Sequence, residues 1–221
     1  LITEIAGDYF KTEDFPFATG KNITIESSKI WAQRLSYVGE LGWELYIPIK
    51  KSNLVFKKIQ TLGKKYNICY AGMHALDTLR LEKKFLHWGH DITSETNPIE
   101  AGLRFAISLK KKQSFIGRHS VEKIISQPLK RKLELFSLRD SKYPGKPLLM
   151  HDEPIYFKSK IVGCSTSANY SFNYKKNIFL AYIDCNYRMN NNLKIEIAGK
   201  KYKIIHETDS LHDPQGKILR S

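Results

Sequence analysis

The sequence predicts an α+β protein in two parts, a mixed helix and strand part followed by a part made of short strands. Trp43, Leu45 and Ile47 alternate with Glu44 and Tyr46, which is the two-residue period of a half-buried strand. Two stretches with apolar residues at helical spacing follow, and after residue 129 this spacing gives way to short strand candidates between turns. These observations favour an αβ layer joined to a small antiparallel barrel or sandwich.

Residues 34–48, RLSYVGELGWELYIP, predict a strand, a glycine turn and a second strand. The apolar residues Ile30 and Ala32 indicate that an extended run precedes the turn, and Gly39 and Gly42 allow the chain to reverse. Glycine also lets a ligand approach the backbone closely. With a carboxylate held beside aromatic rings, the segment indicates a pocket for a flat polar ligand.

Two helices are expected after this strand pair. The first helix is expected over residues 51–66, with Ser52 as its N-cap and an apolar stripe along one side. The second is expected over residues 71–85, with Leu76, Leu79 and Phe85 on its inward face. A strand over 103–107 and a short helix over 117–126 should come next.

The second part of the chain contains short strand candidates separated by turn clusters such as Asn190–Asn192 and Ala198–Lys200. We therefore expect a boundary near residue 126, with one domain over 1–126 and a second over 127–221. The strand candidates are Leu133–Leu138, Ile155–Phe157, Ile161–Thr166, Ile178–Ile183, Leu193–Ile197 and Tyr202–Ile205.

The composition indicates a globular protein with a basic surface. The formal net charge is +14, but the charge is mostly lysine spread along the chain, without an aromatic RNA-binding signature or a helix-turn-helix pattern. No apolar run approaches the ~20 residues that a membrane-spanning helix needs, so we expect no membrane partner. The three cysteines lack a CxxC pair, which favours a reducing compartment, and we expect the cytoplasm.

A metal site is not expected. His87 and His90 are three residues apart and lie next to Asp91, but no HExxH-type arrangement surrounds them. Packing and hydrogen bonding account for these residues more simply.

Several motifs in order resemble the folate-binding aminomethyltransferase family, typified by the glycine-cleavage T-protein. The nearest resemblance is to the folate domain of dimethylglycine and sarcosine dehydrogenases, and it spans essentially the whole chain. The motifs are RLSYVGELGWELYIP (34–48), AGMHALDTLRLEKKFLHWGHDIT (71–93), NPIEAGLRF (97–105), FIGR (115–118), EPI (153–155), VG-x-x-TS (162–167) and DPQG (213–216).

The resemblance implies a ferredoxin-like αβ unit followed by a C-terminal β-barrel. It also implies that the catalytic aspartate of the family lies upstream of this chain, because neither Asp8 nor Asp14 has the matching context. We therefore assign no catalytic residue. The sequence departs from the T-protein branch at one position: Leu76 stands where that branch has an arginine before Asp77. The dehydrogenase-like branch also tends to lack this arginine, so the difference favours a resemblance to that branch.

By the same resemblance, Tyr37 and Glu44 occupy the positions that contact the pterin ring of tetrahydrofolate. A pterin edge presents an N–H beside an amino group, and one carboxylate can accept both. An aromatic ring can pack on the flat heterocycle. Two alternatives stay open: Glu44 as a solvent-facing strand residue and Tyr37 as a core aromatic. Glu40 is expected to be solvated or to cap the turn, and Arg80 and Glu82 to make structural ion pairs or helix contacts.

The function expected from these motifs is the C-terminal portion of a tetrahydrofolate-dependent one-carbon transferase, incomplete as an enzyme. Its partners would be folate and a small methylated amine, together with a missing N-terminal half or a flavin domain. No dinucleotide fingerprint occurs, so we expect no flavin in this chain. The alternative is a basic module that uses the same fold to bind RNA or a protein.

Overall fold

The computed structural model describes residues 1–7, 10–140 and 144–221, so Asp8 lies outside the described residues. The described chain forms two compact units, one of Leu1–Leu79 with His212–Ser221 and one of Arg80–Leu211. The division falls within α3 (Met73–Glu82). The domain boundary expected near residue 126 comes shortly before the first barrel strand, which begins at Arg131, and it stays a prediction.

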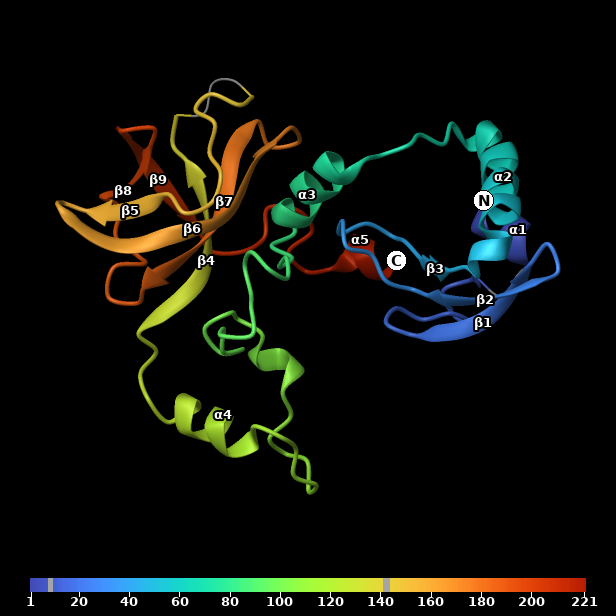
Figure 1. Cartoon of the computed structure of the whole chain (residues 1–221), viewed down its shortest axis with the longest axis horizontal. Coiled ribbons are helices and arrows are strands. Elements are labelled where there is room, and N and C mark those ends of the chain that lie inside the picture. Colours follow the sequence, from blue (N-terminus) through green and yellow to red (C-terminus); the bar gives the residue numbers. More distant parts are fainter. Residues whose placement is uncertain (8–9, 141–143) are drawn as a thin grey trace. The chain divides into compact units, whose positions relative to one another are not determined.

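The first unit contains a three-stranded antiparallel sheet in the order β1-β2-β3 (Figure 1). The apolar face of the sheet packs with helices α1 and α2 around one core, in which Ile25, Ala32 and Val55 are fully buried. The elements are α1 (Ile2–Ala6), β1 (Gly20–Ile25), β2 (Ser28–Gln33), β3 (Glu44–Tyr46), α2 (Ile49–Gly63), a 3₁₀ turn (Lys64–Tyr66) and α5 (Lys217–Arg220).

The predicted strand pair is confirmed. β2 and β3 are antiparallel, with Ala32 opposite Leu45, and the side chains of residues 43–47 alternate between half-buried and exposed. Trp43, Leu45 and Ile47 pack against the core of the first unit. The connection is longer than a tight turn, because residues 34–43 all lie between the two strands.

The first long helix begins earlier than predicted. α2 starts at Ile49 directly after Pro48, whose φ of −54° is fixed by its ring and suits a helix entry. Ser52 is therefore not the N-cap: its hydroxyl lies inside the helix and donates to the Ile49 carbonyl at 2.8 Å. The apolar stripe is confirmed in Val55, which is fully buried.

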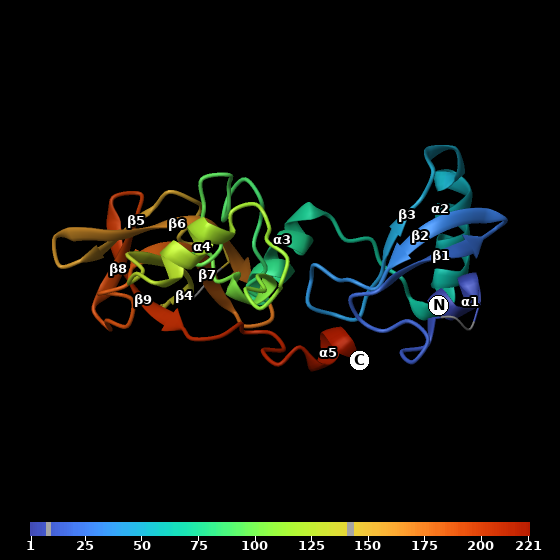
Figure 2. The same cartoon turned by 90° about the horizontal axis from the view of Figure 1, so that it is seen from below.

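The second unit is built on a closed antiparallel barrel in the strand order β4-β7-β6-β5-β8-β9, with β9 pairing back onto β4 (Figure 2). All six predicted strands are present, and closure decides for a barrel over a sandwich. The strands are β4 (Arg131–Leu138), β5 (Pro154–Phe157), β6 (Lys160–Ser171), β7 (Lys176–Asp184), β8 (Leu193–Ile197) and β9 (Lys200–Glu207).

The barrel is apolar on both sides of β4. Phe136 and Leu138 point into the interior, where Phe136 stacks on Phe179 with ring centroids 5.5 Å apart. Leu133 and Leu135 point outward and pack with Leu81 from the end of α3. Because both sides of the strand are buried, apolar residues occur on both faces of β4, and Glu134 is the one carboxylate within it.

One predicted strand is wrong. Residues 103–107 form a 3₁₀ turn at Arg104–Ala106, with local bonds from the Ala106 N–H to the Leu103 carbonyl and from the Ile107 N–H to the Arg104 carbonyl. In the described chain, no strand pairs with this segment through backbone hydrogen bonds, and Phe105 is exposed. The short helix predicted over 117–126 is confirmed as α4 (Arg118–Ile125).

Candidate functional site

The loop at residues 34–43 carries Tyr37 between the two strands of the predicted site. Tyr37 is half-buried. Gly39 has a φ of 81°, a conformation that side chains rarely adopt, and a Cβ on Gly42 would approach the Cβ of Ser36 to 3.2 Å. The path of the loop therefore favours glycine at position 39, and a side chain at position 42 would crowd Ser36.

Glu44 begins β3 and lies opposite Gln33 in the sheet. Its side chain is exposed, and its Oε2 accepts a hydrogen bond of 3.0 Å from the Tyr46 hydroxyl. This bond raises the pKa of the Tyr46 phenol. Neither Glu44 nor Tyr37 lines the cavities described below, so their shared role toward a pterin stays a prediction.

Trp43 joins the core to this surface. Its ring lies edge-on to Phe10 at 5.6 Å and is 5.8 Å from the guanidinium of Arg34. Its indole N–H is buried and has no hydrogen-bond partner among the residues that the structure describes. A buried donor without an acceptor costs free energy, so an acceptor that reached the Trp43 N–H would stabilise the structure beside Glu44.

The C-terminal segment 212–221 holds the loop from the other side. The His212 Nε2 lies 2.7 Å from a carboxylate oxygen of Glu40. Arg34 is buried and donates to the carbonyl of Ser221, while a carboxylate oxygen of Asp213 accepts the first N–H of α5 at 2.8 Å. Glu40, expected to be solvated or a cap, is half exposed and lies against the His212 ring.

A second constellation in the barrel unit centres on Asp91, which is fully buried. One carboxylate oxygen is 2.6 Å from Arg80 and accepts the His87 N–H at 2.8 Å. The other accepts the Ser167 hydroxyl at 2.6 Å and the Thr166 hydroxyl. These contacts satisfy the buried charge and bring together the segments 71–93 and 162–167, which the sequence singles out separately.

A bulge explains how two successive hydroxyls reach one carboxylate. The register between β6 and β7 shifts between Ser165 and Ser167, so Thr166 is an extra residue in its strand. Such an insertion redirects side chains that would otherwise point to opposite faces. Near it, Glu82 accepts from Ser171 at 2.6 Å and from Asn173 at 2.8 Å. Arg80 and Glu82 thus have structural partners.

Glu134 is a buried carboxylate that the sequence reasoning missed. Its burial opposes ionisation, but the nearby His206, whose Nε2 lies 3.5 Å from a carboxylate oxygen, and the charges of Lys132 and Lys84 outweigh this and lower the pKa of Glu134 well below its usual range. Arg188 lies 3.2 Å away. The signal was available, because Glu134 shares the interior-facing parity of the following apolar residues of β4.

The histidines near Asp91 come together without forming a coordination site. The rings of His87 and His90 are 4.7 Å apart between centroids, and His151 lies 6.0 Å from His90. Within the described chain, no three His, Cys, Asp or Glu side chains are arranged to hold a metal. The three cysteines are free. Across the described residues, none of the helices has the length and hydropathy to cross a bilayer.

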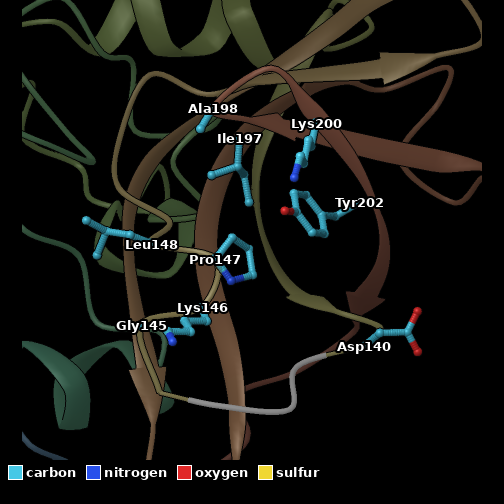
Figure 3. A pocket seen from close by; sticks show the side chains of 9 residues that line it. All are labelled: Asp140, Gly145, Lys146, Pro147, Leu148, Ile197, Ala198, Lys200 and Tyr202. Atoms are coloured by element: carbon cyan, nitrogen blue, oxygen red, sulfur yellow. The ribbon is translucent and has the colours of Figure 1, made fainter.

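Three of the surface cavities lined by described residues are large enough to consider as ligand sites. One of about 500 Å³ lies at the end of α2, between Gln60 and Tyr70. Two others, of about 570 and 320 Å³, adjoin at the β8–β9 hairpin and share Asp140 and Tyr202. Figure 3 shows the larger of these two, with the side chains of Lys146 and Lys200 among its walls.

Two family models match the chain in sequence order. The GCVT N-terminal domain matches residues 1–111, and the glycine cleavage T-protein C-terminal barrel domain matches residues 131–208. The second match coincides with the strands that close the barrel.

Two curated relatives are dehydrogenases. Dimethylglycine dehydrogenase, mitochondrial, of Mus musculus is 32% identical over 97% of this chain and 24% of its own length. Sarcosine dehydrogenase, mitochondrial, of Homo sapiens is 35% identical over 83% of this chain and 19% of its own length. The chain therefore spans a quarter or less of these relatives.

A solved structure, the glycine cleavage system aminomethyltransferase T from Bartonella henselae, has the same fold. The TM-score is 0.79, with 20% sequence identity over 91% of this chain and 54% of that one. Both family models and the fold agree with the ordered motifs, and the chain belongs to the glycine cleavage T-protein family of aminomethyltransferases.

Proposed function

We propose that this chain contributes the folate-binding portion of a one-carbon transferase that accepts a methylene or iminium carbon from a small methylated amine. The observation that carries the proposal is the match of both family domains, in order, to a chain with Tyr37 in the β2–β3 loop and Glu44 at the start of β3. The likeness to dimethylglycine and sarcosine dehydrogenases points to the amine class.

The exposed acceptor at Glu44 fits the donor edge of a pterin. Only one oxygen of its carboxylate accepts a hydrogen bond, from Tyr46, among the described residues. The remaining acceptor capacity can take an N–H and an amino group. Tyr37 would supply a ring surface for the heterocycle.

When bound, tetrahydrofolate would supply the nucleophilic nitrogens that take up the one-carbon unit. The residues of this chain would hold the pterin in one orientation, and this positioning would be their main contribution to the rate of transfer. We assign no proton transfer to any residue of this chain. The flavin that would make the iminium, the cytoplasmic location and a missing N-terminal half all stay predictions.

Calorimetric titration with 5-formyltetrahydrofolate tests the two assigned residues. Glu44→Gln keeps the size of the side chain but removes its charge, and we expect about tenfold weaker binding because a charge-assisted bidentate contact is lost. Tyr37→Leu should also weaken binding, whereas Tyr37→Phe should retain most of it because the ring is kept.

The matched control is Glu13→Gln, which removes one exposed carboxylate from the same unit. We expect its affinity for the folate to equal that of wild type. Equal affinity of wild type and Glu44→Gln would remove Glu44 from the site. The alternative of a basic RNA- or protein-binding module finds no support in the comparisons, and a salt-dependent shift of labelled RNA without a folate response would favour it.

A further inference from the structure

The outer face of the β8–β9 hairpin brings lysines of like charge directly opposite each other. Lys194 on β8 pairs in register with Lys203 on β9, and both side chains are exposed. Like charges at opposed positions of a sheet destabilise it. Neither lysine has an ion-pair partner in the part of the chain that the structure describes. The arrangement therefore costs stability that no described protein group recovers.

A third unpaired cation lies against the same face. Arg139 follows β4, and its backbone N–H donates to the Lys203 carbonyl at 3.0 Å, which holds it beside the hairpin. Arg139, Lys194 and Lys203 line the cavity of about 320 Å³ together with Asp140.

Lys201, which also lines this cavity, is already engaged. Its ammonium lies 3.7 Å from Glu196 and 3.5 Å from the centre of the Tyr156 ring. The charge that remains for a ligand comes from Arg139, Lys194 and Lys203, opposed by one carboxylate, that of Asp140.

The adjoining cavity of about 570 Å³ supplies an apolar wall. Its lining includes Pro147, Leu148 and Ile197, and Leu148 is well exposed. Figure 3 shows the carboxylate of Asp140 directed away from the other labelled side chains of this cavity. The two cavities together have the size of small-molecule sites.

We propose that these adjoining cavities form a binding site for a small organic polyanion, separate from the folate contacts. Its phosphate or carboxylate groups bind Arg139, Lys194 and Lys203, because guanidinium and ammonium groups recognise both anions. Its flat or apolar body lies against Pro147 and Leu148. The site relieves on binding the repulsion between the opposed lysines.

Titration with sodium tripolyphosphate and with citrate tests the anionic half of the site and separates phosphate from carboxylate ligands. In the 221-residue chain at low salt, we expect binding that weakens as NaCl rises, because screening acts on exposed charges. The double variant Lys194→Gln/Lys203→Gln should bind about tenfold or more weakly, since two charge-assisted contacts are lost.

The matched control is Lys110→Gln/Lys111→Gln, which changes the net charge equally at exposed positions away from both cavities. It should bind the probes as wild type does. Equal loss in both double variants would show a response to net charge alone, and no binding of either probe to wild type would also overturn the proposal.

Two further measurements test the lysine pair without a ligand and the apolar wall with a second probe. Lys203→Gln should raise the melting temperature of the unliganded chain, because it removes the opposed like charge. ATP should bind more tightly than tripolyphosphate, and Leu148→Ser should reduce this difference while leaving tripolyphosphate binding unchanged. An unchanged melting temperature together with equal binding of ATP and tripolyphosphate would reject the site.

Discussion

At the scale of single residues, the same kind of side chain serves two different ends in this protein. Glu44 is exposed and keeps acceptor capacity, whereas Asp91 is fully buried and is saturated by Arg80, Ser167 and neighbouring donors. An exposed carboxylate can exchange water for a ligand at little cost, but a saturated buried one cannot. This contrast is the reason why we propose a ligand-binding role for Glu44 and expect a stabilising role for Asp91.

Asp91→Asn should therefore destabilise the chain by roughly 3 kcal/mol, because the variant leaves the guanidinium of Arg80 buried without its counter-charge. Chemical denaturation followed by circular dichroism measures the loss. Ser167→Ala, which removes one of the hydrogen bonds to Asp91, should cost only about 1 kcal/mol. A loss for Asp91→Asn no larger than that of Ser167→Ala would contradict the structural role of the ion pair.

Glu134 predicts a pH dependence of stability. Because its pKa is lower in the folded than in the unfolded chain, its contribution is fully present above the unfolded value of about 4.3 and is lost as the pH falls toward the folded value. Glu134→Gln should thus be less stable than wild type near neutral pH, and the gap should narrow below about pH 4.

Thermal unfolding of wild type and Glu134→Gln over a series of pH values measures this gap. Glu95→Gln, at an exposed position in the same unit, is the control and should follow wild type throughout. A gap that stays constant as the pH is lowered would show that the cations around Glu134 do not depress its pKa.

At the scale of elements, the regular strands with apolar alternation were predictable and the irregular joints were not. β1 was missed because it joins β2 through Glu26 and Ser27, both at positive φ, without the glycine or asparagine that usually marks such a hairpin. The segment 103–107 has strand-like residues but no strand beside it. Local composition does not reveal whether a partner strand is available.

The contact between the 34–43 loop and the C-terminal segment predicts a local effect on dynamics. His212→Gln removes the contact between the imidazole and the Glu40 carboxylate, and hydrogen exchange in the loop should become up to about fivefold faster, as expected for a partly exposed contact. Glu40→Gln should have the same effect, and the double variant should add nothing further because both changes break one contact.

Exchange measured by mass spectrometry on peptides that cover 34–43 and the barrel strands gives the comparison. Barrel peptides should be unchanged in all variants, which provides an internal control. Additive effects of the two single variants would mean that His212 and Glu40 act on the loop independently.

At the scale of the whole molecule, two compact units and a basic surface define the protein. The net charge of +14 would ordinarily suggest a nucleic-acid partner, whereas both family models place the chain in the glycine cleavage T-protein family. The opposed lysines of the β8–β9 hairpin were found from the positions of the charges, not from the net charge, and these positions identify the proposed anion-binding surface.

The sequence by itself determined the family, the α+β class and the six strands of the second unit, because ordered motifs and the two-residue period of strands are local properties of the chain. It also gave Tyr37 and Glu44 as the expected pterin contacts, which stay predictions. Only the tertiary structure decided that β9 closes onto β4, that Asp91 joins two distant motifs, and that Lys194 faces Lys203. These facts depend on pairings between residues far apart in the chain, which register and burial set and local patterns do not encode.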